Sequence, residues 1–237
     1  ANQFNLLDEE GAFEDPPSYE RLAQYRYLRI TEVLAETERL TLSDSAALQN
    51  DVLSLPAKQV QRILQELLNG PGPVSACLSE PSIARRVDLL LRWDARATSD
   101  SEIAGFFESW FRKSLRPRLL AARVRDILGE ESRAAISSID PSRNEQLTGD
   151  PRTALSALDH YLNQDPEMPA RIVADTLYEA EADRSVQTLG DHHHTWFRHP
   201  ASKVVGDAWS LSPIPRSGTP DTVDVAAHDA EGNQTVG

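Results

Sequence analysis

His192-His193-His194, with His199 close behind, are the residues of this chain whose type and spacing most directly suggest chemistry. Imidazole is a common zinc ligand, so the run could form a metal site. Consecutive residues on a strand point to opposite faces, which keeps three adjacent histidines from converging on one ion. His192 and His194 could share a face, yet no cysteine or well-spaced carboxylate completes a ligand set. We expect packing and hydrogen bonding from these side chains, with a zinc site as the alternative.

Other chemistry-bearing patterns are sparse. Cys77 is the single cysteine, so no disulfide can form within the chain. Without a base nearby, a lone thiol is expected to be a small buried hydrophobic group. The sequence has no GxSxG turn of the kind that a Ser-His-Asp hydrolase needs, and no glycine-rich phosphate-binding loop. The residues taken singly therefore provide no complete active site.

The elements that must position these residues are mostly helical. Apolar residues recur at helical spacing over several stretches. The predicted helices are 19–40, 44–69, 81–92, about 101–128, 153–163 and 167–185. Residues 41–44 offer an N-cap, Pro56 forces a kink or break near Leu55, residues 69–73 form a turn, and Pro117 kinks the helix that contains it.

The character of the chain changes after Gly190. Residues 194–198 and 222–228 predict strands, whereas residues 200–220 are rich in Pro, Gly and Ser and predict a loop. One or two strands alone leave unpaired edges. We therefore expect a sheet that is completed by polypeptide outside these 237 residues.

An aromatic cluster lies on the predicted helix 101–128. Its members are Phe106, Phe107, Trp110 and Phe111. Helical spacing favours a place in the core, and the alternative is contact with another chain. On that alternative the protein would be an acidic helical interaction module that docks a partner through this helix, without catalysis.

Charge and composition exclude several partners. The chain has a net charge of −13 and a pI near 4.9. Nucleic-acid binding needs clustered Lys and Arg, and anionic membranes attract basic segments, so neither partner is expected. No apolar run of 18 residues predicts a transmembrane helix, and no signal-peptide pattern opens the chain. The length suits one large domain or part of one.

Several short motifs follow one another along the chain in a fixed order. They are Ala1-Asn2-Gln3, YERLAQYRYLRI (19–30), LQNDVLSLPA (48–57), LRWDAR (91–96), LGDHHHTWFRHP (189–200), PRSG (215–218) and TVD (222–224). In this order they resemble the motifs of the penicillin acylase family of N-terminal-nucleophile amidohydrolases. The departures are Ala95 for the usual glycine, Leu189 for the usual tryptophan and Asp224 for the usual asparagine.

The resemblance implies an α+β fold, the αββα sandwich of N-terminal-nucleophile hydrolases. This chain would be an internal part of the β-subunit, mainly helical with late β-strands. Residues 1–18 would lie as a loop or strand end near the active site, residues 19–188 would be largely helical, and residues 189–237 would return to the sheet. Its partners would be the α-subunit from the same precursor and the rest of the β-subunit.

The resemblance also implies the reaction. An N-terminal serine, upstream of Ala1, would attack an N-acyl amide with its own α-amino group as base. The substrate would be a β-lactam side chain, an acyl-homoserine lactone or an acylated lipopeptide, and these 237 residues alone would be inactive. The precursor would cut itself and be exported to the periplasm or outside the cell.

Three residues acquire candidate roles by this resemblance. Asn2 would donate from its side-chain amide to the oxyanion, although by itself it reads as an ordinary terminal polar residue. Arg29 would support the active site, and its alternative is a helix-surface arginine paired with Glu32 or Glu36. Glu20 would contribute to a structural Ca²⁺ site, against the alternative of a solvated glutamate. No organic cofactor is expected.

Overall fold

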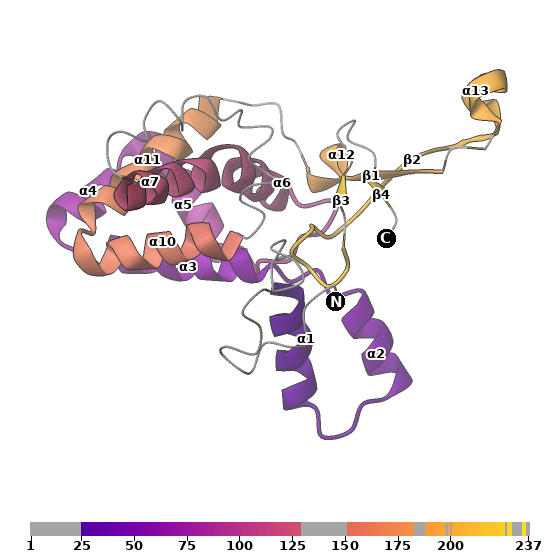
Figure 1. Cartoon of the computed structure of the whole chain (residues 1–237), viewed down its shortest axis with the longest axis horizontal. Helices are drawn as coiled ribbons and strands as arrows, with labels where there is room; N and C mark the ends of the chain where they lie inside the picture. The colour runs from indigo at the N-terminus through magenta and orange to yellow at the C-terminus, as the bar shows by residue number, and fades with distance from the viewer. Residues whose placement is uncertain are drawn as a thin grey trace.

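Helices make up most of the chain in the computed structural model, which describes residues 25–128, 151–182, 188–197, 199, 201–225, 227–228 and 234–235. Most of them pack into one helical body (Figure 1). The body contains α3 (Leu55–Leu68), α4 (Gly72–Leu78), α5 (Pro81–Arg92), α6 (Glu102–Trp110), α7 (Arg116–Leu128), α10 (Pro151–Gln164) and α11 (Glu167–Ala182). Helices α1 (Tyr25–Glu36) and α2 (Leu42–Gln49) project from it as a separate hairpin (Figure 1).

Local capping explains where several helices begin. Thr41 and Asp44 form a capping box that starts α2, as residues 41–44 predict. The predicted helix 44–69 is broken, because α2 ends at Gln49 and α3 starts at Leu55. Ser54 caps α3, and Pro56 occupies its first turn, where a missing N–H has no cost. The chain between these helices, residues 50–54, is thereby freed to pair elsewhere.

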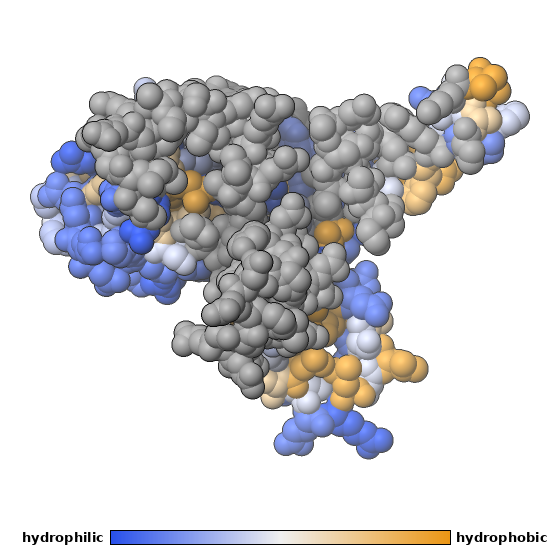
Figure 2. All heavy atoms as spheres, viewed as in Figure 1, coloured by the Kyte–Doolittle hydropathy of each residue, from blue (hydrophilic) through white to orange (hydrophobic). Residues whose placement is uncertain are grey.

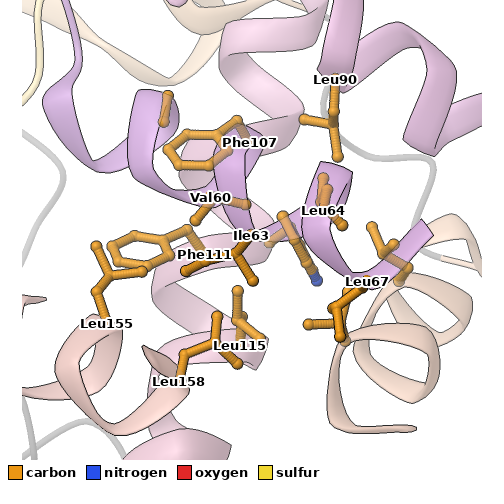
Figure 3. Close-up of a cluster of buried hydrophobic side chains, with 14 of the residues drawn as sticks. Val60, Ile63, Leu64, Leu67, Leu90, Phe107, Phe111, Leu115, Leu155 and Leu158 are labelled. Atoms are coloured by element: carbon orange, nitrogen blue, oxygen red, sulfur yellow. The ribbon is translucent and has the colours of Figure 1, made fainter. Parts of the chain in front are cut away.

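The core of the body is a continuous apolar cluster. Side chains from α3, α5, α6, the π-helical turn Phe111–Leu115 and α10 converge in it (Figure 3). Figure 3 labels Val60, Ile63, Leu64, Leu67, Leu90, Phe107, Phe111, Leu115, Leu155 and Leu158. Trp110 is also buried there, and its indole N–H donates to Thr176 Oγ1 at 3.1 Å. The expectation that the aromatic cluster belongs to the core is confirmed.

The long helix predicted over residues 101–128 is not uniform. Ser101 caps α6 by accepting from Ala104 N, and a π-helical turn over Phe111–Leu115 separates α6 from α7. Pro117 lies one residue into α7 and has no N–H to give to the preceding turn. The irregularity predicted from Pro117 therefore takes the form of a π-turn on its N-terminal side.

One predicted turn is shorter than expected, and one predicted loop is wrong. Asn69 ends α3 as predicted, but α4 already begins at Gly72, and Pro73 suits its first turn. Residues 200–220 contain α13 (Ser202–Val205), a 3₁₀ turn (Gly206–Trp209) and β2 (Leu211–Pro215). Pairing with an earlier strand overrides the loop-like composition there.

The described strands are short and pair within the chain. Strand β1 (His194–Phe197) runs antiparallel to β2, with Thr195 opposite Ile214. Strand β3 (Ala227–His228) pairs with β4 (Gln234–Thr235). The strand predicted at 222–228 thus shrinks to its last two residues. These two-stranded sheets do not amount to a four-layer sandwich, which stays a prediction.

We call β1, β2 and the segment between them, which contains α13 and the 3₁₀ turn, the β1–β2 arm. This arm and the α1–α2 hairpin both extend away from the body (Figure 1). Each carries apolar side chains on its surface (Figure 2), among them Leu40 and Leu42 on the hairpin and Val204 and Trp209 on the arm. In the described part of the chain, no helix combines the length and apolar character needed to cross a membrane.

Candidate functional site

Segments that carry the ordered motifs meet where the helical body joins the β1–β2 arm. We call this place the motif junction and define it by residues 51–54, 93–99, 189–193, 215–219 and 221–224. These segments are far apart in the sequence. Their meeting is therefore a property of the fold and not of local chain geometry.

The first contact joins the segment before α3 to the segment after α5. Ser54 N donates to Ala95 O at 2.9 Å, and Ala97 N donates to Val52 O at 2.9 Å. Gln61, buried in α3, holds the end of α5 by donating to the carbonyl of Trp93 at 2.6 Å. Asp51 and Arg96 are thereby brought onto neighbouring strands of backbone.

The C-terminal segments close onto this pair. Asp224 N donates to Asp51 O at 3.0 Å, and Gly218 N donates to Ala97 O at 2.7 Å. Ser217 Oγ accepts from Ser99 N at 2.9 Å. Every one of these contacts uses a main-chain group, so the junction is held by backbone conformation as much as by side-chain identity.

Two junction residues have positive φ. Gly218 has a φ of 89°, and a Cβ there would lie 2.1 Å from Asp224 O. Ala95 has a φ of 64°, a region that costs an L-residue about 1–2 kcal/mol. Ala95 is the position at which the resembling motif usually carries glycine, and the backbone geometry gives the physical reason for that glycine.

Asp51 is a buried charged side chain of the junction with partners from several segments. Only 7% of the residue is exposed. Its Oδ2 accepts from Arg29 Nε at 2.7 Å, and its Oδ1 accepts from Leu53 N at 3.2 Å. Arg96 Nη1 lies 3.5 Å from Oδ1. One buried carboxylate therefore binds two guanidiniums that come from different parts of the chain.

Arg29 reaches the junction from α1. It pairs with Asp51 and also with Glu32, whose Oε2 lies 2.9 Å from Nη1. Burial by itself lowers the pKa of Arg29, but the hydrogen bonds to Asp51 and Glu32 outweigh burial and raise the pKa above its usual value. The guanidinium is therefore charged throughout the physiological pH range.

A further ion pair and a capping box belong to the polar surroundings of the junction. Arg216 Nη2 lies 3.1 Å from Asp224 Oδ1. At the start of α12 (Leu189–His192), the Oδ2 atom of Asp191 accepts from Thr188 N at 2.6 Å. That backbone hydrogen bond, with a second one from the Thr188 hydroxyl, lowers the pKa of Asp191.

The histidine run does not act as a unit. His193 is buried and its Nδ1 lies 3.0 Å from Gly218 O, so this residue packs and hydrogen-bonds as expected. His192 ends α12, is exposed, and His194 begins β1. Among the described residues, no group of three or more His, Cys, Asp or Glu is arranged to hold a metal ion. Cys77 is half-buried against the core, and its thiol faces Pro73 O.

Of the three candidate residues, only Arg29 lies in the described part of the chain. Asn2 and Glu20 lie outside the described residues, and their roles stay predictions. Arg29 pairs with Glu32, as its surface alternative requires, but it also bonds to Asp51 of the LQND motif. Sequence reasoning missed Asp51 and Arg96 as site residues, although both stand inside quoted motifs. Their meeting depends on tertiary pairing that no spacing reveals.

Chemically, the junction can fix charges and orient donors. It combines a buried carboxylate, a permanently charged guanidinium and a rigid main-chain framework. Such groups position and stabilise a reacting centre when they are preorganised.

A family model described as Penicillin amidase matches residues 1–237, the whole chain. No curated protein matches it.

Proposed function

Because the chain belongs to the penicillin amidase family, we propose that it forms part of an enzyme that hydrolyses the amide bond of N-acyl substrates. The family match over the whole chain carries this proposal and supports an amide hydrolase. The nucleophile would be an N-terminal serine outside these 237 residues. It would be freed when the precursor cuts itself into α and β chains.

The residues of this chain would build the surroundings of that serine. Asn2 would donate to the tetrahedral oxyanion. Arg29 would hold Asn2 and the free amine in place, and its permanent charge suits that role. Glu20 would contribute one oxygen to a structural Ca²⁺ site, whose other ligands would come from elsewhere.

The substrate class follows from the family rather than from the described residues. We propose an N-acyl amide: a β-lactam side chain, an acyl-homoserine lactone or an acylated lipopeptide. The enzyme would act in the periplasm or outside the cell. The alternative, an interaction module docking through the aromatic helix, loses its basis because Phe107, Trp110 and Phe111 are buried in the core.

The test uses the complete processed enzyme and a panel of chromogenic N-acyl amides with aromatic, short and long acyl groups. We expect turnover of at least one substrate by the wild type. Asn2→Ala should lower kcat by about 10²–10³ with the fold intact by circular dichroism. Asn163→Ala is the matched control, because that asparagine is exposed on α10 and bonds only within its own helix; it should leave kcat unchanged.

Three outcomes would contradict parts of the proposal. A wild-type enzyme that cleaves none of the amides would contradict the hydrolase function. Near-normal turnover by Asn2→Ala would remove Asn2 from the oxyanion hole. Turnover by the purified 237-residue chain alone would show that the nucleophile lies within it.

A further inference from the structure

The α1–α2 hairpin has few contacts with the rest of the molecule. Tyr25 is its one fully buried residue within the described chain, and α2 buries none. The Tyr25 hydroxyl donates to Gln59 at 3.2 Å. The other strong tie is the bond from Arg29 Nε to Asp51 at 2.7 Å. In the described part of the chain, these two contacts are among those that place α1 and the groups it carries.

Asp51 is well suited to fix a partner, because its own position is fixed. Its main-chain carbonyl accepts from Asp224 N, and its carboxylate accepts from Leu53 N. The next residue, Val52, accepts from Ala97 N. Because hydrogen bonds fix the backbone on both sides of this carboxylate, the carboxylate determines where the Arg29 guanidinium binds.

We propose that Asp51 is the positioning residue for Arg29, and that it sets the direction in which Arg29 presents its remaining donors to the reaction centre. A guanidinium has five N–H donors in a rigid plane, so binding Nε at one point determines where the Nη groups lie. Asp51 takes Nε and Glu32 takes one donor of Nη1. Within the described residues, the Arg29 side chain makes no other hydrogen bond, so its remaining donors would be available to substrate-side groups.

Arg96 extends this role. Its Nη1 lies 3.5 Å from the other oxygen of Asp51, so both carboxylate oxygens have a guanidinium nearby. Because Glu32 also pairs with Arg29, two carboxylates balance the two guanidiniums of this cluster. The cluster would therefore act through the direction of its N–H donors rather than through net charge.

This inference rests on the proposed function of Arg29, and a double-mutant cycle in the complete processed enzyme tests it. Asp51→Asn keeps the shape of the side chain but faces Arg29 without a charge. We expect kcat to fall by roughly 10–100-fold with little change in KM, because misplacing a positioning group costs turnover. In an Arg29→Ala background, Asp51→Asn should cause no further loss of kcat, although it still lowers the melting temperature.

The matched control is Glu181→Gln. Glu181 also accepts from an arginine, Arg86, but this pair joins α11 to α5 within the helical body. It should lower stability without changing kcat. If Asp51→Asn does not fold, Asp51→Glu keeps the charge and displaces it by one methylene. It should fold and lower kcat, again only when Arg29 is present.

The outcomes separate the two proposals. An active wild type in which Asp51→Asn keeps normal kcat, or loses the same factor with and without Arg29, would overturn the positioning role and leave the hydrolase function standing. A wild type that cleaves no amide would overturn the proposed function and this inference with it. If Asp51→Glu is used instead, a normal kcat, or an equal loss of kcat with and without Arg29, would likewise overturn the positioning role.

Discussion

The helical body and the motif junction are stabilised in opposite ways. In the body, buried apolar side chains pack against one another, and Ile63 and Leu64 are fully inaccessible to solvent. At the junction, main-chain hydrogen bonds and ion pairs join loops, and backbone at Ala95 and Gly218 has positive φ. The body needs volume, which many residue types supply. The junction needs particular backbone angles and donors, which few residue types supply.

The comparison predicts that the body determines stability and the junction determines turnover. The largest expected effect comes from the body. Trp110→Ala removes a side chain that is 1% exposed and leaves Thr176 Oγ1 without its indole donor. We expect a loss of about 3–5 kcal/mol in the free energy of unfolding, measured by urea denaturation. At temperatures where the variant is still folded, its kcat should stay near that of the wild type.

Tyr178→Ala is the control for that variant. Tyr178 lies on α11 and is 64% exposed, so its removal should change stability by less than about 0.5 kcal/mol. A stable Trp110→Ala protein with greatly reduced kcat would break the proposed division between the two regions.

The next effect comes from the junction. Gly218→Ala forces a Cβ to within 2.1 Å of Asp224 O at a φ of 89°. We expect a loss of about 1–3 kcal/mol in stability from strain, and a lower kcat because residues 216–224 must shift. Gly206→Ala is the control, since Gly206 has a φ of 68° with open space around it. If both variants lowered kcat equally, positive φ alone would explain the effect and the close contact at Gly218 would not matter.

The smallest expected effect comes from Ala→Gly substitutions, which should change stability differently in the junction and in the body. Ala95→Gly relieves the strain of positive φ but adds chain entropy in the unfolded state, so stability should stay within about 1 kcal/mol of the wild type. Ala157→Gly, in the buried face of α10, should lose about 1 kcal/mol or more. Thermal denaturation of both variants measures the difference. Equal losses would contradict the strained geometry at residue 95.

Local signals explain which elements could be predicted from the sequence. The cap at Thr41, the break before Pro56 and the helix at 81–92 all depend on residues close to one another. Helix α4 was not predictable in this way, because its Gly-Pro start resembles a turn. Strand β2 contains two prolines and forms through pairing with β1, a contact that composition does not show.

The candidate site, too, could be predicted from the sequence only in part. A resemblance of ordered motifs is enough to identify the family, which the match over residues 1–237 confirms. Arg29 could be named as a candidate from its motif. The carboxylate that binds it could not, since Arg29 lies on α1 and Asp51 in the segment between α2 and α3, and the two meet only after the hairpin is placed.

The distances in sequence between junction partners have a consequence for the order of folding. Ser99 and Ser217, which are hydrogen-bonded to each other, are 118 residues apart. Helices α3 to α7 follow one another and can begin to pack while the chain is still emerging from the ribosome. The junction must wait until residue 224 has been synthesised, and it closes against a large loop entropy. A nascent chain would thus hold packed helices before it holds the complete junction, whose last contacts form late in biogenesis.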